Sequence, residues 1–175
     1  MNIEKKLGIY NYKRKEFYHA VNFTLKYYRK YPTIEILNHA ASRYKTLSND
    51  RQDFGDIKIP SFNFYKNPQD LLIDFEVEYI QGITLNNLRT TEINTLNINE
   101  KIWKGMIERK SNFGFTDITL KNFVVTENEE IYFIDIEGYT EMSLDYRKFY
   151  FIRNTLQFKD VSKITGLELT EWQER

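Results

Sequence analysis

The 175-residue chain contains no cysteine, which excludes disulfide bonds, thiolate catalysis and cysteine-ligated metal sites. Its two histidines, His19 and His39, lie far apart in the sequence and do not predict a histidine-rich metal site. No run of about 18 apolar residues occurs, so we expect no membrane-spanning helix. The first residues, Met1 to Lys6, lack the apolar region of a secretory signal. A cytoplasmic protein is therefore expected.

An excess of charge of either sign is also lacking, because 25 Lys and Arg residues balance 25 Asp and Glu residues. This balance gives no global electrostatic reason to expect binding to nucleic acid or to an anionic membrane. The basic stretch from Lys13 to Lys30 keeps an RNA-binding module open as an alternative. Hydrophobic residues make up 41% of the chain, with 13 Tyr and 13 Phe, so a well-packed folded core is expected.

Glycine and proline are scarce, at seven and three residues, so each break in the pattern is informative. Segments rich in β-forming residues predict strands over 21–28, 58–65, 71–79, 123–126 and 131–134. The second and third of these strands form one predicted hairpin, and the last two form another.

Apolar periodicity predicts three helices, beginning near Thr33, Asn99 and Leu144. The first helix is expected to bury one face, which consists of Ile34, Leu37, Ala41 and Tyr44. Strands dominate the first half of the chain and helices the second. This order predicts an α+β fold with a division near Gly82, giving domains over 1–82 and 83–175.

Three polar side chains stand out in apolar surroundings in the second half: Asp117, Asn122 and Asp135. Asn122 enters one strand of the second predicted hairpin and Asp135 ends the other, so the hairpin brings them near each other. Asp117 lies on the preceding loop and can reach the same space. Carboxylate and amide oxygens are suitable ligands for Mg²⁺, and a second carboxylate can orient a hydroxyl and take its proton.

The loop from Asp117 to Asn122, followed by a hairpin and Ile134-Asp135, resembles the catalytic and metal-binding loops of the protein-kinase superfamily. The resemblance implies a two-lobed protein-kinase-like fold with a minimal C-terminal lobe. It also implies that Asp117 is the catalytic base, that Asn122 and Asp135 bind Mg²⁺, and that ATP is the phosphoryl donor.

Upstream segments follow the order of the same family. The stretch ending in Lys26 is similar to the strand with the phosphate-binding lysine, and Glu35 on the next helix would be the ion-pair partner of Lys26. The segment from Phe75 to Leu85 is similar to the strand and hinge whose backbone binds adenine. This likeness assigns Glu78 and Ile80 to nucleotide binding.

Among kinase-like proteins, the short second half resembles small atypical kinases. These are RIO-type, lipopolysaccharide-core and tRNA-modification-associated kinases, together with aminoglycoside phosphotransferases. The implied activity is transfer of the ATP γ-phosphoryl group to a hydroxyl acceptor, either a protein or a small molecule, whose identity the motifs do not fix.

Three departures from the family pattern support an alternative, a pseudokinase that acts as a binding or regulatory module without catalysis. The family histidine two residues before the catalytic Asp is Phe115 here. The metal-binding triplet is Asp135-Ile136-Glu137, without Phe-Gly. No glycine-rich loop precedes Lys26.

Overall fold

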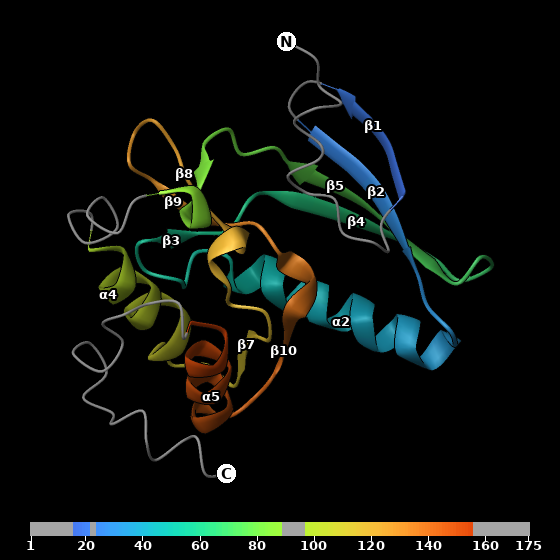
Figure 1. Ribbon diagram of the computed structural model, residues 1–175. Coiled ribbons are helices and arrows are strands. Elements are labelled where there is room, and N and C mark those ends of the chain that lie inside the picture. Colours follow the sequence, from blue (N-terminus) through green and yellow to red (C-terminus); the bar gives the residue numbers. More distant parts are fainter. Residues whose placement is uncertain (1–15, 22–23, 89–96, 156–175) are drawn as a thin grey trace. The chain divides into compact units, whose positions relative to one another are not determined.

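The structure is a computed structural model that describes residues 16–21, 24–88 and 97–155 (Figure 1). The mixture of helices and strands confirms the predicted α+β class. The chain divides into two compact units: unit 1 comprises Met1–Lys45 and Pro60–Tyr79, and unit 2 comprises Thr46–Ile59 and Ile80–Arg175. The two units are described separately below.

Unit 1 contains a four-stranded antiparallel sheet in the order β1-β2-β5-β4 (Figure 1). Its strands are β1 (Glu16–Val21), β2 (Thr24–Lys30), β4 (Phe62–Asn67) and β5 (Leu72–Glu78). The strand predicted over 21–28 is thus the end of β1 and most of β2, with residues 22–23 outside the described part. The predicted hairpin of the second and third strands is confirmed as β4 and β5.

One face of this sheet is buried because apolar side chains alternate along its strands. Leu25 of β2 lies opposite Val77 of β5, and Tyr27 lies opposite Phe75. The rings of Tyr27 and Phe75 are stacked at 4.9 Å between centroids, and Tyr44 meets Phe75 edge-on at the same distance. Tyr44 belongs to helix α2 (Ile34–Asp50), so α2 packs on this face.

Helix α2 begins where the sequence predicts, and the hydroxyl oxygen of Thr33 accepts a hydrogen bond from the N–H of Ile36. Its buried stripe differs from the predicted one. The fully buried residues lie three, four and three positions apart and are Leu37, Ala40, Tyr44 and Leu47. Leu37 and Tyr44 are thus confirmed, whereas Ile34 is 38% exposed and Ala41 is only partly buried, so the prediction was wrong at these two positions.

Unit 2 contains a four-stranded sheet in the order β3-β9-β8-β6 and a separate two-stranded pair, β7 with β10. The strands are β3 (Ile57–Lys58), β6 (Ile83–Thr84), β7 (Phe113–Phe115), β8 (Phe123–Val125), β9 (Ile131–Phe133) and β10 (Tyr139–Glu141). The helices and turns are η2 (Leu85–Asn87), α4 (Ile98–Ile102), the π-helix η3 (Trp103–Ile107), η4 (Leu120–Asn122), η5 (Ile136–Gly138) and α5 (Leu144–Thr155).

The second predicted hairpin is confirmed as β8 and β9, with Val124 opposite Tyr132. The strand predicted over 58–65 is wrong in its extent, because it is split between β3 and β4. Pro60 lies between the two pieces, and its ring removes a backbone donor that a continuous strand would need. Lys58 therefore belongs to β3, which pairs in parallel with β9.

The helix predicted near Asn99 begins at Ile98 and continues into the π-helix η3. Gly105 in η3 lies against the turn after α2: a Cβ atom at this position would be 2.2 Å from the carbonyl oxygen of Phe54. This close approach requires glycine. Among the helices of the described residues, none is long and apolar enough to cross a membrane.

Candidate active site

The structure brings Asp117, Asn122 and Asp135 together within unit 2. Asp117 lies on the loop that follows β7, and Asn122 is the last residue of η4, immediately before β8. Asp135 follows β9 after one intervening residue, Ile134. The backbone N–H of Ile134 donates to the carbonyl oxygen of Asn122 at 2.9 Å, so pairing of the two chain segments extends to the site.

The side-chain amide of Asn122 lies between the two carboxylates. Its Nδ2 donates to the backbone carbonyl oxygen of Asp117 at 2.8 Å and to the Oδ2 atom of Asp117 at 3.1 Å. The same nitrogen lies 3.4 Å from Oδ2 of Asp135. Asn122 is 1% exposed, so a buried amide fixes the position of two partly exposed acids.

The loop that carries Asp117 is held by its own apolar residues and by backbone hydrogen bonds. Ile118 is fully buried and Leu120 is 9% exposed. The N–H of Thr119 donates to the carbonyl oxygen of Asp117 at 3.0 Å, and the N–H of Asn122 donates to that of Thr119 at 2.9 Å. The apolar side chains thus bury the loop while the polar ones remain at the site.

A cation that the sequence prediction did not assign also lies at the site. The Nζ atom of Lys121 is 3.6 Å from Oδ2 of Asp117, and the two side chains are 54% and 36% exposed. The two acids and this lysine give the cluster a formal charge of −1. The sequence predicts no helix here, and the structure has a loop followed by a single turn, so the helical i, i+4 rule could not have identified the pair.

The donor set suits a hard divalent cation such as Mg²⁺, because carboxylate and amide oxygens are its preferred protein ligands. Asp135 supplies a carboxylate, and the Asn122 amide has its oxygen as a second donor while its Nδ2 stays bound to Asp117. The described residues contain no group of three or more His, Cys, Asp or Glu side chains suited to a metal. A cation here would therefore need further oxygen ligands from a substrate.

Lys26 lies on β2 and forms an ion pair with Glu76 of β5, its cross-strand neighbour. The hydrogen bond and the charge of Glu76 raise the pKa of Lys26. Strand alternation places Lys26 on the sheet face opposite Leu25 and Tyr27, which is the face away from α2.

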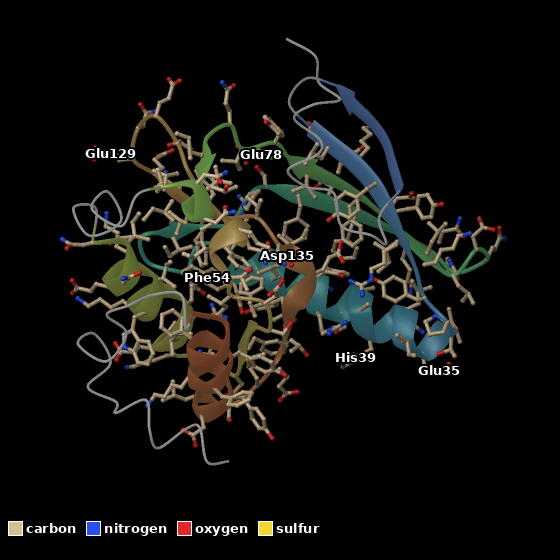
Figure 2. The ribbon with its side chains drawn as sticks, viewed as in Figure 1. Glu35, His39, Phe54, Glu78, Glu129 and Asp135 are labelled. Atoms are coloured by element: carbon tan, nitrogen blue, oxygen red, sulfur yellow. The ribbon has the colours of Figure 1, made fainter. Side chains whose placement is uncertain are left out.

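Glu35 lies in the exposed first turn of α2 (Figure 2). Its own backbone N–H and the hydroxyl of Thr33 hold the pKa of Glu35 below its usual value. The expected ion pair between Lys26 and Glu35 is not formed among the described residues, because Lys26 points away from the helix that carries Glu35. The roles of both residues in nucleotide binding remain predictions.

Glu78 lies at the end of β5 (Figure 2). It already has hydrogen-bond partners. Its Oε2 accepts from the N–H and the hydroxyl of Ser61 at 2.9 and 2.6 Å, and its own N–H donates to the carbonyl oxygen of Ser61 at 2.8 Å. Ile80 is 5% exposed. The adenine contacts assigned to Glu78 and Ile80 remain predictions.

The sequence prediction also missed a second group of polar residues in unit 2. Asp50, Arg109 and Tyr139 form one hydrogen-bonded cluster although they are widely separated in the sequence. No local spacing links these three residues, so the sequence held no signal for their contact.

No protein-family model matches the chain, and no curated protein matches it. Solved structures do match. One is a co-crystal structure of WbdD with the kinase inhibitor LY294002, at 14% identity and a TM-score of 0.53, over 94% of this chain and 40% of that chain. Another is a medium-resolution structure of the bifunctional kinase-methyltransferase WbdD, at 10% identity and a TM-score of 0.49, over 81% of this chain and 33% of that one. The chain therefore spans less than half the length of these proteins. The first likeness identifies the fold as kinase-like.

Proposed function

We propose that the protein is an ATP- and Mg²⁺-dependent phosphotransferase that moves the γ-phosphoryl group to a hydroxyl acceptor. The observation that carries the proposal is the convergence of Asp117, Asn122 and Asp135 on a kinase-like fold. Neither the fold nor the residue cluster would suffice alone, because one fold can host many functions and a cluster of acids can serve many kinds of chemistry. Together they support phosphoryl transfer.

Each residue has a role in this proposal. Asp117 accepts the proton of the acceptor hydroxyl while the new bond between oxygen and the γ-phosphorus forms. The bond between the γ-phosphorus and the bridging oxygen breaks, and ADP leaves with the bond electrons. Asn122 and Asp135 would hold Mg²⁺, which would neutralise charge on the phosphates. Lys121 lies close enough to Asp117 to add positive charge beside the transferred group.

The direct test is incubation with labelled ATP and Mg²⁺, followed by a search for label on the protein and on candidate hydroxyl acceptors. We expect transfer by the natural chain and at least about 100-fold slower transfer by the Asp117→Ala and Asp135→Ala variants, with the fold of each checked by circular dichroism. Transfer at the natural rate by either variant would contradict the assignment.

A pseudokinase that acts by binding is the second candidate, and the position of Lys26 favours it. Lys26 is paired with Glu76 on the face of the sheet away from α2, and so has no contact with Glu35 of that helix. A thermal-shift series distinguishes the two candidates, because a ligand that binds the folded state raises its apparent stability. Stabilisation by ATP that requires Mg²⁺ supports the enzyme. Stabilisation by ATP alone, or none, supports the binding module.

A further inference from the structure

A buried polar cluster in unit 2 joins the end of α2 to the segment that follows Asp135. It consists of Asp50, the last residue of α2; Arg109, which follows η3; and Tyr139, the first residue of β10. Tyr139 is fully buried and the Arg109 side chain is 6% exposed. Buried polar groups of this kind need partners, and these three partner one another.

The contacts within the cluster fix the direction of the Tyr139 hydroxyl. This hydroxyl donates to Oδ2 of Asp50 at 2.6 Å and accepts a hydrogen bond from Nη2 of Arg109. The same Nη2 lies 3.6 Å from Oδ2 of Asp50, and the guanidinium stacks 4.0 Å above the ring centre of Phe54. Phe54 is labelled in Figure 2. Because the hydroxyl has both a donor and an acceptor partner, it cannot rotate without losing one of them.

The surroundings of Tyr139 keep its hydroxyl protonated, chiefly because the phenol is buried. Burial and the hydrogen bond to Asp50 raise the pKa of Tyr139, although the positive charge of Arg109 opposes them. Arg147 of α5 is the other charged group close by, and its Nη1 donates to the carbonyl oxygen of Arg109 at 3.0 Å. Tyr139 is therefore a permanent donor to Asp50 at neutral pH.

Tyr139 is only four residues from Asp135, and the chain between them is held at both ends. At the first end, the N–H of Ile134 donates to the carbonyl oxygen of Asn122 at 2.9 Å. At the other end, the N–H of Thr116 donates to the carbonyl oxygen of Gly138 at 3.1 Å, and Tyr139 pairs with Phe115. These last contacts also hold the strand that leads into Asp117.

We infer that Tyr139 is a positioning residue for Asp135 and Asp117, and that Asp50 and Arg109 hold its hydroxyl in place. The last turn of α2 is then part of the framework of the site. The chemical consequence rests on the proposed phosphotransferase function, whereas the positioning itself can be measured without any activity. Residues that orient metal ligands from behind affect metal affinity by about 10- to 100-fold.

The first test measures hydrogen exchange of single amides in the natural chain and in the Tyr139→Phe and Asp50→Asn variants. The Tyr146→Phe variant is the matched control, since Tyr146 is 62% exposed on α5. We expect exchange at Ile134 and Thr116 to rise about tenfold in the first two variants, because local opening needs fewer broken contacts. The amide of Thr126, which donates to Glu130 in the β8–β9 turn, is the internal reference and should not change.

An equal rise at all three amides would indicate general loss of stability and would overturn the inference, as would no rise at Ile134 and Thr116. The second test measures the dissociation constant of Mg²⁺-ATP and the transfer rate. The Tyr139→Phe variant should bind about tenfold more weakly than the natural chain, with Tyr146→Phe unchanged.

The two tests separate the two proposals. If the natural chain neither binds Mg²⁺-ATP nor transfers phosphate, the proposed function fails and the exchange measurement alone decides the positioning role. If the natural chain is active and Tyr139→Phe keeps its affinity and rate, the positioning role is wrong and the function stands.

Discussion

The polar groups of the two units are held in different ways. In unit 1, Lys26 and Glu76 pair on the sheet face away from α2, with side chains that are 44% and 32% exposed. In unit 2, Asn122 is buried and bonds to two acids. A group with several fixed neighbours has one geometry, whereas an exposed pair has many of similar energy. The polar groups of unit 2 are therefore held in a more fixed geometry than the Lys26–Glu76 pair of unit 1. Four substitutions test this difference between the units.

The largest effect is expected for Asp117→Ala. Loss of a general base lowers the rate of proton-coupled transfer by about 10²- to 10⁴-fold, and we expect a fall of this size in kcat. Steady-state transfer of labelled phosphate measures it. Asp145→Ala, which removes an exposed acid from the first turn of α5, is the control and should keep the natural rate. A comparable loss in both variants would refute the specific role of Asp117.

Asn122→Ala should have the next largest effect, because it removes the amide that separates two carboxylates. Loss of buried hydrogen bonds to charged groups costs about 2 kcal/mol of unfolding free energy. Urea unfolding at neutral pH measures the change. The control is Asn63→Ala, at an exposed position of β4 in unit 1. This variant should leave the urea midpoint of unfolding nearly unchanged. Equal losses at the two positions would erase the proposed difference between the units.

Tyr139→Phe should lower the unfolding free energy by about 1.5 kcal/mol at neutral pH, through loss of the hydrogen bond to charged Asp50. This loss should depend on pH. The folded state holds the phenol proton more tightly than the unfolded state, whose pKa is near 10, so the stabilisation is complete below pH 10 and declines above it. The difference in unfolding free energy between the natural chain and the variant should therefore become smaller above pH 10. Urea unfolding at pH 7 and pH 11 measures this difference. A difference that grows would contradict the raised pKa.

The smallest effect on stability is expected for Lys26→Ala, because an exposed ion pair contributes little to folding. Its thermal midpoint should match that of the natural chain. ATP titration of the same variant then tests the phosphate-binding role that the kinase resemblance implies. Weaker binding than in Lys30→Ala would support the role. Equal binding would leave Lys26 as a surface residue.

Local patterns in the sequence predicted the elements that depend on neighbouring residues. The β8–β9 hairpin and the start of α5 at Leu144 follow from strand and helix propensity, and the convergence of Asn122 with Asp135 follows from the hairpin. Helix α2 was also predicted, and two members of its predicted stripe, Leu37 and Tyr44, are buried. The rest of the stripe depends on which side chains meet other elements, so Ala40 is buried whereas Ile34 is 38% exposed.

Contacts between distant residues could not be predicted in the same way. The pairing of Lys58 with Tyr132 in the β3–β9 ladder joins segments 74 residues apart, and the hydrogen bond from Tyr139 to Asp50 spans 89. The face of the sheet on which Lys26 lies could not be fixed either, since alternation predicts two faces but not which one α2 covers.

The parallel edge strand β3 limits how the protein can be divided. β3 comes from Thr46–Ile59, a segment that precedes β4 and β5 in the chain and yet completes the sheet of unit 2. A gene fragment that starts at Ile83 would leave β9 with an open edge and remove Phe54 from beneath Arg109. A fragment that carries Asp117 and Asp135 therefore needs the upstream segment Thr46–Ile59 to keep the sheet of unit 2 complete.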